Sequence, residues 1–295
     1  MEKIRCALCG GSVQSPLYTI NNYHIVKCPS CGLCFVNPQP GEDELKKFYD
    51  TEFYSGRHFS KYALKPYWEG DNLEKRKYSQ RMRLGKIKAW KKKGRLLDFG
   101  CGDCLFLSCA KEEGWDVSGY EFASPGGELE KLYKEYHVVS GSLAPDSFSA
   151  DSFDVITMWA VIEHLRDPVG ILSTLGKFLK KDGLLVIYTV NIESKRAKKD
   201  GPAWDMLTPP SHLYYFSDTT LKKAVLKSGL ALKRLEITSE LISIKTPKEG
   251  TRGSGAVQVF KNITGRYLFP LKHFIRKAAG RIFKGTEITA YAGKN

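Results

Sequence analysis

Four cysteines near the N-terminus have the spacing of a metal site. Cys6 and Cys9 form one C-x2-C pair, Cys28 and Cys31 form a second, and 18 residues separate the two pairs. This spacing is typical of structural zinc sites with four thiolate ligands and no open position. A segment of about 40 residues needs such a staple because its apolar core is small. We therefore predict a structural zinc ion here. Four buried free cysteines are the alternative, and Cys34 is either a buried neighbour or a substitute for Cys31.

A glycine-rich turn follows the first strong strand pattern of the chain. Residues 96–103 read LLDFGCGD, and glycines in a strand-to-helix turn let a ligand approach the backbone and let the chain adopt positive φ. Roughly 20 residues later, Glu121 ends the next expected strand, where a carboxylate can accept from both hydroxyls of an adenosine ribose. The pattern predicts a nucleoside site across these two strand ends. Cys101 and Cys104 repeat C-x2-C here without a second pair, so we expect small core residues rather than metal ligands.

This turn resembles the D-x-G-x-G loop of the class I S-adenosylmethionine-dependent methyltransferases. Asp98, Gly100 and Gly102 occupy the three signature positions, and Cys104 stands where many members carry a third glycine. Nicotinamide-dependent oxidoreductases are the chief alternative. Their G-x-G-x-x-G pattern would require glycine where this chain has Leu105, so the methyltransferase resemblance is the better one.

The resemblance implies a cofactor, S-adenosylmethionine, and the residues around it. The loop would hold the methionine end, Glu121 the ribose, and Ser142 with Leu143 would lie beside the adenine. Residues 153–168, FDVITMWAVIEHLRDP, are similar to the fourth strand and following helix of these enzymes, which places Trp159 and Glu163-His164 near the cofactor. The implied cofactor-binding set is Asp98, Gly100, Cys101, Gly102, Glu121, Ser142, Leu143 and Trp159.

The loop at residues 204–216 carries the densest group of imidazole and phenol side chains, in the segment PPSHLYYFS. Loops beyond the carboxyl ends of strands hold the substrates of open α/β sheets. Methyl transfer is an in-line displacement, so the protein aligns the acceptor and removes its proton when needed. We predict His212 as the general base, because imidazole titrates near neutral pH, and Tyr214 or Tyr215 as the group that orients the acceptor. His164 is a second candidate base, and the alternative is that these aromatics only pack in the core.

The elements that must position these groups alternate between strands and helices. Strands are expected at residues 95–100, 115–122, 137–141, 153–160, 184–190, 231–238 and 287–292, with helices over 104–113, 124–136, 168–183 and 217–228. This alternation with short connections predicts an α/β, Rossmann-like fold with a seven-stranded, mostly parallel sheet and helices on both faces.

Punctuation by proline and glycine near residue 40 predicts three regions. These are a zinc-binding module at residues 1–40, a helical linker with the first helices of the catalytic domain at 41–93, and the catalytic domain at 94–295. Residues 245–285 form a basic, partly amphipathic insertion between the last two strands. An interfacial helix in contact with a membrane, a lid over the site and a helix packed on the sheet are the three interpretations of this segment.

Composition and charge narrow the class of protein. The chain is 42% hydrophobic, which is ordinary for a globular protein. It has no apolar run of roughly 20 residues and no signal-peptide pattern, so we expect a soluble cytoplasmic protein with, at most, peripheral membrane contact. The net charge of +14 is uneven: residues 51–95 carry +10 (14 Lys and Arg against 4 Asp and Glu), 96–192 carry −8 (7 against 15) and 193–295 carry +12 (20 against 8). The basic flanks indicate either an anionic partner or a solvated lysine-rich surface.

The four-cysteine module, the N-P-x-P linker and the S-H-L-Y-Y-F-S loop together resemble a subgroup of methyltransferases that act on sugars. This subgroup includes enzymes that C-methylate nucleotide-linked deoxysugars and relatives found with surface-polysaccharide synthesis. The resemblance implies a sugar acceptor, nucleotide-linked or in a glycan, methylated at carbon or oxygen. An RNA-base methyltransferase is the first alternative, although the cysteine module is neutral and no N-P-P-Y or D-P-P-Y follows the fourth strand. A non-catalytic protein that binds the cofactor or a partner is the second.

Overall fold

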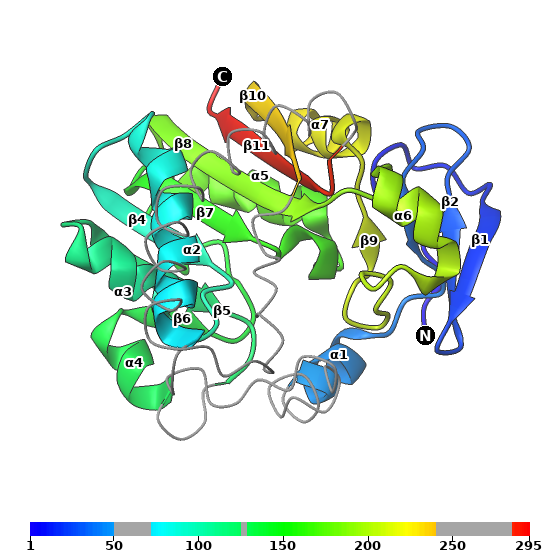
Figure 1. The fold of residues 1–295 in the computed structure, drawn as a ribbon, viewed down its shortest axis with the longest axis horizontal. Coiled ribbons are helices and arrows are strands. Elements are labelled where there is room, and N and C mark those ends of the chain that lie inside the picture. The colour runs from blue at the N-terminus through cyan, green and yellow to red at the C-terminus, as the bar shows by residue number, and fades with distance from the viewer. Residues whose placement is uncertain (50–71, 125–128, 240–284) are drawn as a thin grey trace, which may run out of the picture.

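Two sheets organise the chain (Figure 1). The computed structural model describes residues 1–49, 72–124, 129–239 and 285–295. Seven strands form the large sheet in the order β10-β11-β8-β7-β4-β5-β6, and four short strands form a second sheet in the order β1-β2-β3-β9.

Most strands of the large sheet run in the same direction. Its parallel strands are β4 (Arg95–Phe99), β5 (Asp116–Glu121), β6 (Val138–Ser140), β7 (Phe153–Trp159) and β8 (Leu179–Val190). The last strand, β11 (Glu287–Gly293), lies antiparallel between β8 and β10 (Ala231–Thr238). The predicted seven-stranded, mostly parallel sheet is therefore confirmed, with the C-terminal strand inserted between two earlier ones.

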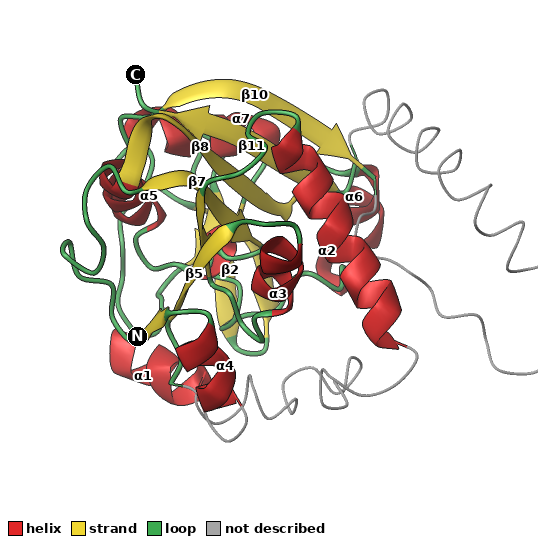
Figure 2. Ribbon diagram, turned by 90° about the vertical axis from the view of Figure 1, so that its left-hand side faces the viewer, coloured by secondary structure: helices red, strands yellow, loops and turns green. Residues whose placement is uncertain are grey.

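Helices cover both faces of this sheet (Figure 2). One face carries α2 (Asn72–Lys88), α3 (Leu105–Glu112) and α4 (Leu129–Glu135), and the other carries α5 (Pro168–Phe178) and α7 (Asp218–Lys227). Successive side chains of a strand point to opposite faces, and accordingly Leu96 packs in the core beneath α3 whereas Leu97 packs in the core beneath α5. The two apolar cores thus fix which residues reach each end of every strand.

Helix α5 begins as the sequence predicts and ends earlier. Its N-cap is Asp167, whose side chain accepts a hydrogen bond from the Gly170 backbone at 2.9 Å, and Pro168 occupies the first turn. The helix ends at Phe178 rather than beside Gly183, because Leu179 is already buried and paired with Phe153 at the start of β8. Strand β8 therefore begins at Leu179, in a stretch that the sequence assigned to the helix.

The second sheet joins the N-terminal segment to a distant loop. It comprises β1 (Ser15–Ile20), β2 (Tyr23–Lys27), β3 (Cys34–Val36) and β9 (Tyr214–Tyr215), all antiparallel. In Figure 1 this sheet lies at one side of the molecule, next to α6 (Lys195–Asp200). Lys223 and Lys227 of α7 also donate to the carbonyl oxygens of Cys31 and Ala7, at 3.2 and 2.9 Å. The boundary expected near residue 40 therefore separates segments that share a sheet and a core.

The remaining described elements are short. They are α1 (Glu42–Phe48) and the 3-10 turns η3 (Ile162–His164) and η4 (Gly201–Ala203). No helix in the described parts of the chain is long and apolar enough to cross a membrane. The basic insertion at 245–285 lies, up to residue 284, outside the described residues.

Candidate active site

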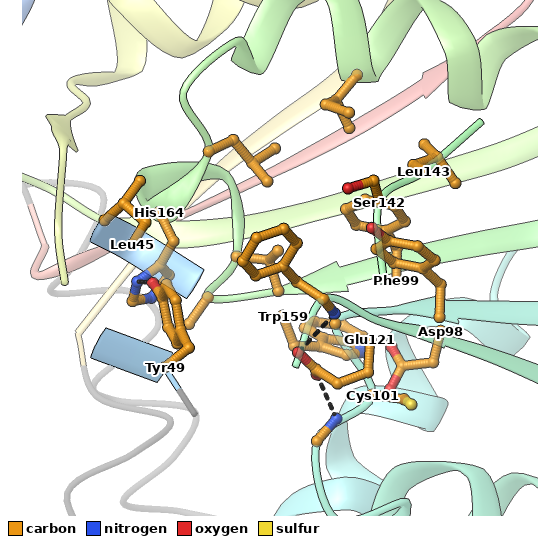
Figure 3. Close-up of a pocket in the computed structure, with 18 of the residues that line it drawn as sticks. Leu45, Tyr49, Asp98, Phe99, Cys101, Glu121, Ser142, Leu143, Trp159 and His164 are labelled. Carbon is orange, nitrogen blue, oxygen red and sulfur yellow. Dashed lines mark hydrogen bonds between the residues drawn. The ribbon is translucent and has the colours of Figure 1, made fainter. Parts of the chain in front are cut away.

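A cavity of about 1310 Å³ opens along the carboxyl ends of β4, β5 and β7 (Figure 3). One end is lined by the glycine-rich turn and Glu121, and the other by Tyr49, His164 and Arg166. Strand ends from one edge of a parallel sheet meet here, as expected for an open α/β fold. The implied cofactor residues all line this cavity, namely Asp98, Gly100, Cys101, Gly102, Glu121, Ser142, Leu143 and Trp159.

The turn after β4 requires its glycines. Gly100 has φ +81° and Gly102 has φ +53°, backbone angles that residues other than glycine rarely adopt. A Cβ on Gly100 would also lie 2.4 Å from Cγ2 of Val161, whereas a Cβ on Gly102 would meet no atom within 4 Å in the described structure. Cys104, at φ +61°, completes the turn as the N-cap of α3. The position of the missing third glycine is thus also left-handed.

Glu121 holds the turn and the end of β5 together. One carboxylate oxygen accepts from the backbone N–H of Gly102 at 3.0 Å, and the other accepts from Phe122 at 2.9 Å and Ala123 at 3.4 Å (Figure 3). These bonds fix the carboxylate at the cavity wall. The residue predicted to bind a ribose therefore also shapes the loop predicted to bind the methionine end.

Asp98 is buried at the end of β4. Burial raises the pKa of this carboxyl to about 7, although the hydroxyl of Thr157, which donates to it at 2.6 Å, and the Arg83 guanidinium both oppose the rise. A cationic group bound next to Asp98 would favour its ionised form. This environment suits the ammonium group of an amino acid such as methionine.

Arg83 is a residue of the site that sequence reasoning missed. Its guanidinium carbon lies 5.1 Å from the ring centroid of Trp159 and 5.8 Å from that of Tyr188, within cation–π range. The residue belongs to the basic run that we expected to face an anionic partner or solvent, and it lines the cavity instead. No local signal distinguishes it from its basic neighbours. The adjacent Arg76 pairs with Asp103 of the turn.

His164 and Tyr49 form the wall at the opposite end. The His164 Nδ1 lies 2.8 Å from the backbone oxygen of Ser211 and 3.0 Å from the hydroxyl of Tyr49 (Figure 3). Burial lowers the pKa of His164 to about 4, so the ring is neutral at pH 7. Burial also raises the pKa of Tyr49 above its usual range. A neutral imidazole and a neutral phenol therefore face the cavity.

His212 lies directly behind His164. The two ring centroids are 4.7 Å apart with the planes nearly perpendicular, and the Nδ1 of His212 lies 2.8 Å from the backbone oxygen of Met206. His212 is not among the described residues that line the cavity. The structure thus brings the two predicted histidines together and places His164, rather than His212, at the wall.

The two loop tyrosines point into packed surroundings. Tyr214 and Tyr215 are each 1% exposed in strand β9. The Tyr214 hydroxyl donates to the backbone oxygen of Arg166 at 3.1 Å, and that of Tyr215 donates to the backbone oxygen of His212 at 3.2 Å. Of the two, Tyr214 lies beside two residues that line the cavity, Arg166 and Gln39.

The four N-terminal cysteines converge at a second place. Their sulfur atoms all lie within 4.8 Å of one another, with 3.4 Å between Cys6 and Cys31 and 3.4 Å between Cys9 and Cys28. Cys34 lies apart from this group in β3, where its thiol is 3.8 Å from the Gly32 carbonyl oxygen. The donor set and its convergence fit a tetrahedral metal ion.

Comparisons with known proteins agree with this geometry. A family model described as a methyltransferase domain matches residues 70–235. Similar curated proteins include the ubiquinone biosynthesis O-methyltransferases of Cereibacter sphaeroides, 33% identical over 106 residues (34% of this chain and 43% of the relative), and of Haemophilus ducreyi, 27% identical over 107 residues (33% and 45%). The chain spans less than half the length of these relatives.

Solved structures show the same fold at low identity. A S-adenosylmethionine-dependent methyltransferase from Archaeoglobus fulgidus has a TM-score of 0.50 at 21% identity, over 74% of this chain and 94% of the other. The 1,6-didemethyltoxoflavin-N1-methyltransferase of Burkholderia thailandensis, with bound S-adenosylhomocysteine, has a TM-score of 0.53 at 14% identity, over 95% and 99%. Since the family model covers more than half of the 295 residues and the cavity carries the matching loop, the chain belongs to the methyltransferase-domain family.

Proposed function

We propose that the protein transfers the methyl group of S-adenosylmethionine to a carbon or oxygen atom of a sugar, either nucleotide-linked or in a glycan. The observation that carries this proposal is one continuous cavity, which joins the glycine-rich turn to the wall formed by Tyr49 and His164. Gln39, Glu42 and Arg166 also line the cavity. Hydrogen-bonding groups beside an aromatic ring suit a ligand with many hydroxyls.

The acceptor's proton leaves, in this proposal, at the imidazole pair. His164 is neutral and faces the cavity, and the ring of His212, the predicted general base, contacts it from behind with its plane nearly perpendicular. The Tyr49 hydroxyl, 3.0 Å from His164, is placed to orient the acceptor. Tyr214, expected to do so, is not among the described lining residues and would act through its neighbours Arg166 and Gln39.

The cysteine module, we propose, holds a structural zinc ion on Cys6, Cys9, Cys28 and Cys31. Their sulfur atoms converge within 4.8 Å, and the small sheet offers little apolar core of its own. The ion would fix the turn that precedes β3 and so the partner strand β9. Its role is structural because four thiolates fill a tetrahedral site.

A second candidate acceptor is a phenol, since the curated relatives are O-methyltransferases of ubiquinone biosynthesis. These matches cover about a third of this chain, 33% and 34%. A phenolic hydroxyl requires the same proton removal as a sugar hydroxyl.

The test is methyl transfer from labelled S-adenosylmethionine to a panel of acceptors, read by mass spectrometry. The panel contains nucleotide-linked keto-sugars, an oligosaccharide, a catechol and a short RNA. We expect methylation of a sugar, lost in His164→Ala while S-adenosylhomocysteine still binds, and retained in the matched variant His24→Ala, because His24 is exposed on β2. Methylation of the catechol alone, or of the RNA alone, would contradict the sugar assignment.

A further inference from the structure

Three metal-binding side chains converge behind the acceptor wall. Glu163, His164 and His212 each place one potential ligand atom within 4.8 Å of the other two. This group is separate from the four cysteines and comes from η3 and the loop that leads into β9. We infer that these three residues bind a divalent transition-metal ion at the acceptor end of the cavity.

The carboxylate of Glu163 is the first argument for an ion. Glu163 is 1% exposed, and among the described residues neither of its oxygen atoms has a hydrogen-bond partner of good geometry, although the nearby Thr189 hydroxyl favours the ionised carboxylate. An unpaired buried carboxylate is costly, and proteins normally provide a cation or hydrogen-bond donors for it. The backbone of Glu163 is fixed, because its carbonyl oxygen accepts from Leu213 at 2.8 Å. A cation between this side chain and the histidines would supply the missing partner.

The orientation of both imidazoles is the second argument. The Nδ1 of His164 lies 2.8 Å from the Ser211 carbonyl oxygen, and the Nδ1 of His212 lies 2.8 Å from the Met206 carbonyl oxygen. A carbonyl oxygen can only accept, so each Nδ1 carries the hydrogen in the neutral ring. This tautomer places the lone pair of each neutral ring on Nε2, although His164 also lies near a second backbone acceptor, the carbonyl oxygen of Ala160. Histidine ligands of metals show this pattern, in which the second nitrogen donates to a backbone carbonyl or carboxylate.

Two imidazoles and one carboxylate define the class of ion. This set suits zinc, iron, cobalt or manganese and leaves coordination positions open, unlike the closed set of four thiolates. Metal–nitrogen bonds of about 2.0–2.1 Å place the donors of one ion closer together than the 4.8 Å limit within which these three atoms lie, so ion binding would draw the donors together.

The catalytic consequence rests on the proposed function, whereas ion binding does not. Of the three residues, His164 alone is among the described residues that line the cavity, so an acceptor hydroxyl would reach an open position on the ion from the His164 side. Coordination lowers the pKa of such a hydroxyl. With the ion bound, the ring nitrogens of His164 and His212 are occupied, so the hydroxyl proton passes to solvent instead of to the imidazole pair. The oxygen lone pair then forms the O–CH3 bond, and the S–CH3 bond breaks with its electron pair kept by sulfur, leaving S-adenosylhomocysteine.

The first experiment titrates Mn²⁺ into the zinc-loaded protein and follows free Mn²⁺ by its electron paramagnetic resonance signal. Thiolates disfavour Mn²⁺, so the cysteine module does not interfere. We expect one tightly bound Mn²⁺ per chain, weakened about 100-fold in Glu163→Gln because a ligand is lost. The control is Glu121→Gln, the same change in another carboxylate of the cavity, which should leave Mn²⁺ affinity unchanged. A titration with Zn²⁺ repeats the comparison with a stronger binder.

A thermal denaturation series gives a readout that does not need activity. Mn²⁺ should raise the melting temperature of the wild type and of Glu121→Gln and should leave that of Glu163→Gln unchanged. His212→Gln serves as the second variant should Glu163→Gln fail to bind S-adenosylhomocysteine. Binding of neither ion beyond the zinc of the cysteines, or equal binding by wild type and Glu163→Gln, overturns the inference. Ion binding without methylation of any acceptor would support the site and contradict the proposed function.

Discussion

Substitution of Gly100 by alanine tests whether the glycine-rich turn packs directly against Val161, the residue that precedes η3. Gly100 has φ +81°, and an added Cβ would lie 2.4 Å from Cγ2 of Val161. The left-handed backbone costs alanine about 1–2 kcal/mol, and overpacking costs typically about 1–3 kcal/mol more. We therefore expect Gly100→Ala to lower the free energy of unfolding by about 2–5 kcal/mol.

A double-mutant cycle separates these two costs. Val161→Ala removes the methyl group that the new Cβ would meet, so Gly100→Ala with Val161→Ala should recover about 1–3 kcal/mol of the loss. Gly102→Ala is the matched control, because its φ is also positive but no atom lies within 4 Å of the added Cβ. It should cost only the backbone term of about 1–2 kcal/mol. Its Cβ enters the cavity, so it should weaken S-adenosylhomocysteine binding.

The assay is urea denaturation monitored by fluorescence and circular dichroism, with S-adenosylhomocysteine binding measured by calorimetry on each variant. A Gly100→Ala protein within 0.5 kcal/mol of the wild type would refute the positive φ and the contact together, since ordinary surface changes are of about that size. Strict additivity of Gly100→Ala and Val161→Ala would refute the contact alone.

Three further predictions concern the charges and the metal of the site. The pKa of Asp98 is raised to about 7, and an ammonium group bound beside it would favour its ionised form, so S-adenosylhomocysteine should bind about tenfold more weakly at pH 6 than at pH 8. Calorimetry in buffers of different ionisation enthalpy should show proton release on binding, and an affinity that does not change with pH would contradict this. Arg83→Met should lose about 0.5–2 kcal/mol of cation–π energy, measured by denaturation. It should also move the midpoint of the pH dependence of S-adenosylhomocysteine binding to higher pH, because the charge of Arg83 lowers the Asp98 pKa; an unchanged midpoint would argue against this electrostatic coupling. Cys28→Ser should reduce the zinc content and the melting temperature. It should also abolish turnover while S-adenosylhomocysteine still binds, because β3 of the cysteine module pairs with β9, the strand that follows His212. Full turnover at reduced zinc content would show that the module does not position the acceptor wall.

The convergence of the implied cofactor residues on one cavity could be predicted because their signals are local. A buried strand, a turn with Asp98, Gly100 and Gly102, and an acidic residue at the next strand end occur within a short stretch of sequence. Each belongs to a strand or turn of the same sheet edge, and the parallel order of β4 and β5 follows from that pattern. The added role of Glu121, as an acceptor for Gly102 N–H, lies in the same local unit.

The acceptor half could not be predicted because its contacts are long-range. Tyr49 and His164 are in contact although 115 positions separate them in the sequence, and Arg83 of α2 lies against the ring of Trp159 in β7. Their partners depend on how α1 and α2 pack on the sheet, and this packing cannot be deduced from the types of the individual residues. The same holds for β11, whose alternating sequence predicts a strand but not its insertion between β8 and β10. The spacing of His212 and Tyr214 indicated chemistry, whereas their depth depends on β9 joining β3.

The pairing of β9 with β3 explains why a cysteine module accompanies this catalytic domain. A strand of two residues has too few hydrogen bonds to hold its own position, and small sheets need packing or a staple for stability. Val36, at the end of β3, donates to the Leu213 carbonyl oxygen at 2.8 Å, and Leu213 donates in turn to the Glu163 carbonyl oxygen at 2.8 Å. Two backbone hydrogen bonds thus connect the strand beside Cys31 to the residue beside His164. We therefore expect the geometry of the wall formed by Tyr49 and His164 to depend on the folded state of the cysteine module, and loss of the proposed zinc ion to reduce methyl transfer before it reduces cofactor binding.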